Sequence, residues 1–349
     1  MIFPIRPAAA ARAVLAAVVL VSAGGCTTLG TAPAKAGGPG AQAPPANPAN
    51  AAAASTMSSQ ATDPAKPDGG GARRGDTRLV DTPPVEVVPP QVQVRRLDLD
   101  RVRQGMQPVP QAFITDLPAS LQKIERAGKR KRLFIKTMLP AVLRANAAIK
   151  ADRDFVKAVI ALDIPPGELP DKMRRKLRAL AEAYEVDPSN LAALKRRVDI
   201  VPPALVLAQA AIETGWGTSR FAQQGNAIFG QHTSDPDDRG MVPKGLEDPS
   251  FRVRAFEIVT GAVEAYLRNL NTHPAYAELR RIRAEARARG DYPDGPEMAA
   301  GLADYSARGQ DYVEDIRLTI RANDLQAFAD ARLRPSVDRL VDARSFGEP

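Results

Sequence analysis

The stretch AIETGWGTSRFAQQGNAIFG, residues 211–230, contains one carboxylate at the end of an apolar segment. This residue is Glu213, and Gly-Trp-Gly follows one residue later. Glycine just past the last helical residue commonly ends a helix, because it adopts left-handed backbone angles without steric cost. Prolines at 202 and 203 suit the first turn of the same helix. Glu213 is therefore expected in the last helical turn, where the chain turns away.

The neighbours of Glu213 suggest what its carboxyl could do. Val206, Ala210 and Glu213 are spaced i, i+4 and i+7, so the carboxyl shares a helix face with small apolar residues. Such surroundings disfavour the ionised form and raise the pKa. A raised pKa suits a general acid that works near neutral pH. A buried structural acid has the same pattern, so these residues alone leave both interpretations open.

Helical segments surround this stretch. The folded part is expected to begin near Phe113, and apolar residues are at helical spacing over residues 117–163, on both sides of Pro140. Two further helices are predicted over 170–186 and 187–198, the second with a capping segment at 187–190. Beyond Glu213, the segment 241–258 is typical of a β-hairpin, because apolar residues alternate there with arginines. The alternating residues are Phe251, Val253 and Ala255 with Arg252 and Arg254.

The N-terminus carries the features of an exported protein. Residues 1–25 contain two arginines, no acid and the apolar run AVLAAVVLVSA, which is typical of a secretory signal. This run is short of the roughly 20 apolar residues that span a bilayer. The only cysteine, Cys26, follows in AGGC, which resembles a bacterial lipobox. Lipidation of Cys26 is predicted, with Thr27 favouring the outer membrane; ordinary cleavage nearby is the alternative.

Composition predicts a tether between the signal and the folded part. Residues 26–111 are dominated by Ala, Pro, Gly, Ser and Gln, and such a segment buries too little apolar surface to fold. The formal charge is +8, and +6 without the two arginines of the signal. This excess suits an anionic partner. Export argues against nucleic acid, which leaves cell-wall polymer and membrane surfaces.

The central segment resembles the catalytic core of glycoside hydrolase family 73, and most of all its Bax-type branch of bacterial peptidoglycan N-acetylglucosaminidases. The pattern Ala-x-x-Glu-(Ser/Thr)-Gly-Trp-Gly-x-Ser followed by Gly-Asn-x-x-Phe-Gly carries the resemblance. It is matched by Ala210, Glu213, Thr214, Gly215, Trp216, Gly217, Ser219, Gly225, Asn226, Phe229 and Gly230. Later segments continue the likeness in order, over roughly residues 115–330. A catalytic domain is thus expected at 112–332, followed by an unassigned tail at 333–349.

The resemblance implies a mainly α-helical, lysozyme-like domain with a small β-hairpin lobe beside a sugar groove. It implies that Glu213 is the general acid for the β-1,4 bond between N-acetylglucosamine and N-acetylmuramic acid. A second carboxylate is expected in the hairpin lobe, where Glu247 is favoured over Asp248, Asp237 and Asp238. Carboxyl groups about 6.5–9.5 Å apart invert and those about 5–5.5 Å apart retain configuration, while a substrate-assisted route needs no second acid.

Other residues of the motif are assigned by the same resemblance. Tyr312 matches a tyrosine near the catalytic glutamate, and Tyr305 opens the same segment, YSARGQDYV. A catalytic role is predicted for Tyr312 and substrate binding for Tyr305, since a phenol there could hydrogen-bond the acetamido group or stabilise the developing charge. A buried tyrosine with a satisfied hydroxyl is the alternative for both. Trp216, the only tryptophan, either stacks on a sugar or packs over the helix end. Asn226 and Phe229 are expected at the groove, shaping its turn more than contacting substrate.

Two other functions remain open at this level. A lytic transglycosylase also uses one catalytic Glu, and a non-catalytic wall-binding lipoprotein would keep the groove without activity. Zinc chemistry needs three or four ligands, whereas the chain has only His232 and His273, so no metal or cofactor is expected. The favoured interpretation is a peptidoglycan hydrolase tethered to the periplasmic face of the outer membrane.

Overall fold

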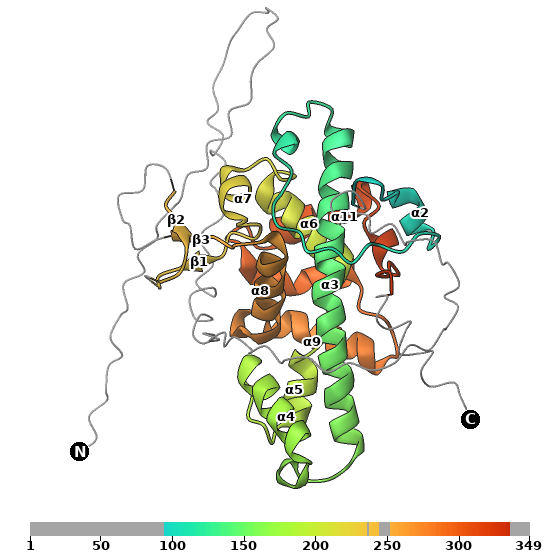
Figure 1. Ribbon diagram of the computed structural model, residues 1–349, viewed down its shortest axis with the longest axis vertical. Coiled ribbons are helices and arrows are strands. Elements are labelled where there is room, and N and C mark those ends of the chain that lie inside the picture. Colours follow the sequence, from blue (N-terminus) through green and yellow to red (C-terminus); the bar gives the residue numbers. More distant parts are fainter. Residues whose placement is uncertain (1–93, 236, 244–251, 336–349) are drawn as a thin grey trace, which may run out of the picture.

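The computed structural model describes residues 94–235, 237–243 and 252–335. These residues form a mainly helical domain with one small antiparallel sheet at its side (Figure 1). The predicted fold class, mainly α with a small β lobe, is confirmed. Among the described residues, no helix combines the length and the apolar composition needed to cross a membrane.

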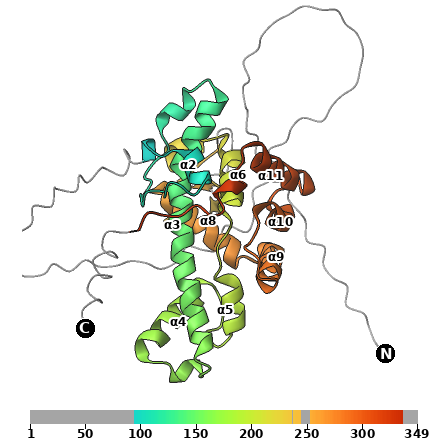
Figure 2. The same ribbon diagram turned by 90° about the vertical axis from the view of Figure 1, so that its right-hand side faces the viewer.

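The longest helix, α3 (Ala127–Ala161), runs the length of the domain, and the other elements pack along it (Figures 1 and 2). The helix continues through Pro140, although an interior proline removes a backbone hydrogen bond and costs about 3 kcal/mol. Complete burial of the neighbouring Met138, Leu139 and Val142 offsets this cost. The helical spacing predicted over residues 117–163 is thus confirmed for Ala127–Ala161.

One end of α3 carries a pair of short helices, α4 (Asp171–Ala183) and α5 (Leu191–Arg197). Asn190 caps α5, because its Oδ1 accepts a hydrogen bond from the backbone N–H of Ala193 at 3.0 Å. Both helices and the cap were predicted from the sequence, and they are confirmed.

The centre of the domain is α6 (Pro203–Thr214), whose alanines, valine and leucines are buried on every side. It contacts α3 and α11 (Gln310–Ala322) most extensively. The remaining α-helices are α2 (Leu99–Arg103), α7 (Arg220–Gly225), α8 (Val259–Thr272), α9 (Ala277–Ala288) and α10 (Gly295–Met298). Short 3-10 helices lie at Ala119–Gln122, Pro166–Glu168, Pro274–Tyr276, Ala299–Tyr305 and Gln326–Phe328.

The sheet has strands β1 (His232–Thr233), β2 (Gly240–Met241) and β3 (Arg252–Arg254), in the order β1-β3-β2. Both pairings are antiparallel, and Val253 of the central strand lies opposite His232 and Met241. Val253 is buried while its two arginine neighbours are partly exposed, so the predicted alternation holds across β3. Pairing of β1 with β3 extends the predicted hairpin to three strands.

The predicted tether, residues 26–111, is wrong for residues 94–111. Leu97 and Leu99 are fully buried in the core, and Asp98 caps α2 by accepting from the backbone N–H of Asp100. Val109 pairs with the start of the predicted tail, because its N–H donates to Arg332 and its carbonyl accepts from Arg334. The composition of the whole predicted tether obscures the few apolar side chains of residues 94–111, and burial of these side chains orders the segment.

Truncation of Leu99 tests whether this segment belongs to the folded domain. We expect Leu99→Ala to lower the free energy of unfolding by roughly 2–5 kcal/mol, since it leaves a cavity in the core. Met106→Ala, in the same segment but 65% exposed, should change it by less than about 0.5 kcal/mol. Urea denaturation of the purified chain measures both. Equal midpoints for the two variants would contradict the assignment of Leu99 to the core.

Candidate active site

The end of α6 is a Schellman motif that exposes the position of Glu213. The N–H of Trp216 donates to the carbonyl of Ala211 at 2.8 Å, and the N–H of Gly215 donates to that of Ile212. Gly215 is left-handed with φ 56°, which confirms the predicted helix end. Glu213 therefore lies in the last turn, as its sequence position indicates.

Backbone angles and close contacts explain the residue types of the Gly-Trp-Gly turn. All three residues have positive φ, with 60° at Trp216 and 81° at Gly217. A Cβ on Gly217 would lie 2.8 Å from Leu121 Cδ1 and 2.9 Å from Phe134 Cδ2, so only glycine fits against the start of α3.

Trp216 packs over the helix end. Its ring meets Phe134 edge-on with centroids 5.8 Å apart, and Lys131 Nζ lies 4.8 Å from the ring centroid. Packing over the helix end is thus observed, and stacking on a sugar stays a prediction. The side chain keeps partial exposure beside this contact.

The carboxyl of Glu213 is held by a hydroxyl. Tyr312 donates its O–H to Glu213 Oε1 at 2.7 Å, and Gln209 Nε2 donates to the same hydroxyl oxygen at 3.4 Å. Because Gln209 donates, the Tyr312 hydroxyl turns its own proton toward the carboxyl. Glu213 and Tyr312, which the sequence places 99 residues apart, are thus brought into direct contact.

The surroundings of this carboxyl raise its pKa to about 7. Burial among apolar atoms is the main cause, since it disfavours the charged form. The hydrogen bond from Tyr312 and the positive charge of Arg308 act in the opposite direction and limit the rise. Although Glu213 as a whole residue is partly exposed, the group is enclosed closely enough to hold a proton near neutral pH.

An aromatic cluster supports Tyr312 from behind. The rings of Tyr312 and Tyr305 stack with centroids 5.2 Å apart at 8°, and Tyr305 donates its hydroxyl to the carbonyl of Phe229 at 2.8 Å. Phe229 stacks in turn on Tyr266 at 3.8 Å. Burial raises the pKa of the Tyr266, Tyr305 and Tyr312 phenols well above 10, so these phenols stay protonated. The cluster fixes the direction from which Tyr312 reaches Glu213.

Asn226 joins the turn after α7 to two other segments. It is left-handed with φ 50°, and its Nδ2 donates to the carbonyls of Thr115, Phe256 and Glu257. The side chain is only 5% exposed, so these contacts take up its amide.

Direct substrate contact by Asn226, Phe229 and Tyr305 therefore stays a prediction. Their side chains are buried and their polar groups are used within the fold. A polar or aromatic residue in a motif has the same sequence appearance whether it faces a ligand or the core. The expectation that Asn226 and Phe229 shape the turn agrees with the observed contacts.

The second carboxylate stays a prediction. Glu247 and Asp248 lie outside the described residues. Of the alternatives, Asp238 accepts from Thr233 Oγ1 at 2.7 Å and pairs with Arg254 at 3.4 Å, which makes it part of the sheet's own contacts. Asp237 is exposed.

Sequence reasoning missed Gln209 and Arg308. Gln209 is the single polar residue of the run PALVLAQAAI, and it lies four residues before Glu213. A fully buried amide on the same face as a carboxyl is a usable sign of a polar network. Arg308 gave no such sign, because its position near Glu213 depends on tertiary structure alone.

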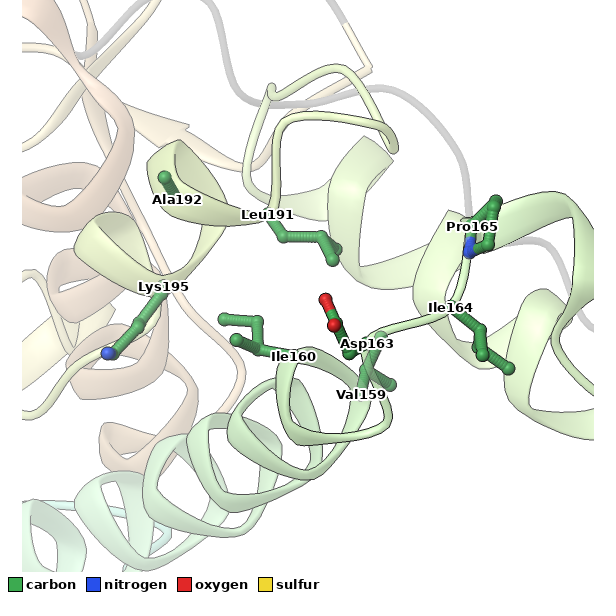
Figure 3. Close-up of a pocket in the computed structure, with 8 residues that line it drawn as sticks. All are labelled: Val159, Ile160, Asp163, Ile164, Pro165, Leu191, Ala192 and Lys195. Atoms are coloured by element: carbon green, nitrogen blue, oxygen red, sulfur yellow. The ribbon is translucent and has the colours of Figure 1, made fainter.

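The described residues line two pockets away from Glu213. One, of about 510 Å³, lies between the C-terminal end of α3 and α5; Figure 3 shows the Asp163 carboxylate pointing into it. The other, of about 770 Å³, lies between α3, the start of α6 and residues 329–333. Neither has Glu213 among its lining residues.

This chain belongs to the glucosaminidase family. The family model described as mannosyl-glycoprotein endo-beta-N-acetylglucosaminidase matches residues 189–325, which include α6, Glu213 and Tyr312. Protein bax of Escherichia coli (strain K12) is 34% identical over 204 residues, covering 55% of this chain and 69% of that protein. The catalytic domain of the autolysin Auto from Listeria monocytogenes is 15% identical over 49% of this chain and 94% of that domain. Its TM-score is 0.29, too low for any argument about the fold.

The raised pKa of Glu213 leads to a prediction about stability that can be tested without measuring enzymatic activity. The folded state holds this proton up to about pH 7, whereas the unfolded state releases it near 4.5. Because only the unfolded state ionises between about pH 4.5 and 7, stability falls over this range, by up to roughly 3 kcal/mol at 1.4 kcal/mol per pKa unit.

Glu213→Gln should remove this loss. We expect the variant to gain stability over the native chain across that pH range and to keep a constant advantage above pH 7. Urea denaturation at pH 4.5, 6, 7 and 8 measures the difference. A difference that does not change with pH would contradict the raised pKa.

Proposed function

We propose that this protein is a peptidoglycan hydrolase that cleaves the β-1,4 bond between N-acetylglucosamine and N-acetylmuramic acid. The observation that carries the proposal is the Glu213 carboxyl, with a pKa of about 7 and a hydroxyl partner, at the end of a helix. Membership of the glucosaminidase family supports N-acetylglucosamine as one of the two sugars that the cleaved bond joins.

In this proposal Glu213 is the general acid. Oε1 accepts the hydrogen bond from Tyr312, so the acidic proton resides on Oε2, the oxygen away from the phenol. Transfer of this proton to the glycosidic oxygen lets the sugar leave as a neutral hydroxyl. The carboxylate that remains is stabilised by the Tyr312 hydroxyl and by the charge of Arg308.

The opposite face of the sugar needs either a second carboxylate or the sugar's own acetamido group. Glu247 remains the proposed second carboxylate, on the strength of its place in the sequence beside β3. A second carboxylate either acts as a base that activates water or acts as a nucleophile that forms a covalent intermediate. Without a second carboxylate, the acetamido oxygen attacks the anomeric carbon.

The products distinguish this proposal from its alternatives. Mass spectrometry of fragments released from purified cell-wall sacculi should show reducing-end N-acetylglucosamine for the native protein and none for Glu213→Gln. Since the amide keeps shape and loses the proton, the variant should lose at least about a hundredfold in rate.

Two outcomes would overturn the proposal. Anhydro-muramic ends would identify a lytic transglycosylase. Binding to sacculi without any release would identify a non-catalytic wall-binding protein.

We further propose that a lipid on Cys26 anchors the protein to the periplasmic face of the outer membrane. The apolar run before AGGC and the single cysteine support this location. Cys26→Ser should move the protein from the membrane fraction to the soluble fraction, which fractionation and immunoblotting measure. Retention of the variant in the membrane would contradict a lipid anchor at this residue.

A further inference from the structure

The larger pocket lies at the opposite end of α6 from Glu213. Pro203, the first residue of the helix, lines it, and the rise over the ten residue steps from Pro203 to Glu213 is about 15 Å. The positive end of the helix dipole therefore lies at the pocket, while the proposed general acid lies at the other end. The two sites are separate, and one buried helix connects them.

The floor of the pocket is a cluster of charged side chains in which the cations outnumber the acids. The buried carboxylate of Asp199 pairs with Arg153 at 3.2 Å and with Arg287 at 3.0 Å, and Arg283 lies behind it at 3.9 Å. Three guanidinium groups thus share one carboxylate. Arg287 contacts Asp199 through Nε and Nη2, so its outer edge, with Nη1, is not needed for this pair.

Further cations surround the floor. The pocket lining includes six basic side chains, Lys150, Arg153, Lys157, Lys195, Arg287 and Arg332, and three acids, Asp154, Asp199 and Asp330. A concave site with this excess favours an anion, and guanidinium groups bind carboxylates through paired hydrogen bonds. Asp154 already pairs with Lys150 at 2.8 Å, whereas Asp330 is exposed and can receive an ammonium group.

The volume and the apolar lining narrow the class of ligand. About 770 Å³ is within the roughly 300–1,000 Å³ of small-molecule sites, and Leu143, Ile200 and Leu333 line part of it. An inorganic anion would leave most of this space empty. A short peptide with free carboxylates and an amine would engage the cations, Asp330 and the apolar residues together.

We propose that this pocket binds the carboxylate end of a short acidic peptide. The identity of this peptide rests on the proposed function: its natural source is the peptide attached to the glycan that the protein cleaves. Occupation of the pocket would then hold a peptide-bearing strand while Glu213 acts about 15 Å away.

Binding of the N-acetylated tripeptide Ac-Ala-γ-Glu-Lys, which has two carboxylates and one amine, to the full chain tests the pocket by isothermal titration calorimetry at low salt. We expect saturable binding, and at least tenfold weaker binding for the double variant Lys157→Glu, Lys195→Glu, whose exposed side chains line the pocket. The control is Lys172→Glu, Arg175→Glu on α4, with the same charge change on exposed residues outside the lining. This control should stay within twofold of the native chain.

Three outcomes would overturn the pocket assignment: no binding, equal weakening by both double variants, or equal binding of the tripeptide with its carboxylates amidated. Inorganic phosphate that binds where the tripeptide does not would also overturn it.

The link to the substrate is tested separately, with peptide-bearing and peptide-free glycan strands. The native protein should cleave the peptide-bearing strand faster, and the Lys157→Glu, Lys195→Glu variant should cleave both alike. No preference in the native protein would overturn the link to the glycan's peptide. If neither strand is cut while the tripeptide still binds, the proposed function fails and the pocket stands.

Discussion

A carboxyl group keeps its proton near neutral pH only where water is largely withheld from it, and the organisation of this domain follows from that constraint on Glu213. The apolar helix α6 places the group at its last turn, among packed side chains that disfavour charge. The same enclosure that raises the pKa also costs folding free energy once the group ionises. The site is therefore maintained by the rest of the core, including the long helix α3 that packs along α6.

The Tyr312 hydroxyl limits the rise in the pKa of Glu213. Without any partner, a desolvated carboxyl would hold its proton too tightly to release it during a reaction. One hydroxyl, oriented by Gln209 and supported by the stack on Tyr305, offers enough stabilisation of the charged form to keep the pKa near 7. The buried aromatic residues of the motif thus act on the carboxyl through Tyr312 without reaching the solvent.

Most of the helices could be predicted from the sequence, because their apolar spacing, caps and glycine stops are local features. The α5 cap and the Gly215 stop are examples, and both hold in the structure. The buried positions of Asn226 and Tyr305 could not be predicted, since a motif does not say which way a side chain faces. Residues 94–111 were misassigned because composition averages over a window, whereas four or five apolar side chains suffice to order a segment against an existing core. The polar contact of Gln209 with the site could have been predicted from its sequence position, whereas the position of Arg308 near Glu213 could not.

The pairing of Val109 with residues 332–334 brings both ends of the described domain to one place. A pulling force applied through the chain before residue 94 would first load the buried leucines of the α2 segment and the backbone hydrogen bonds at Val109. The hydrogen bonds at Val109 involve neither α6 nor Tyr312. If the protein works while attached to a membrane on one side and a rigid polymer on the other, mechanical tension would be borne at this junction, and the geometry around Glu213 would be shielded from it.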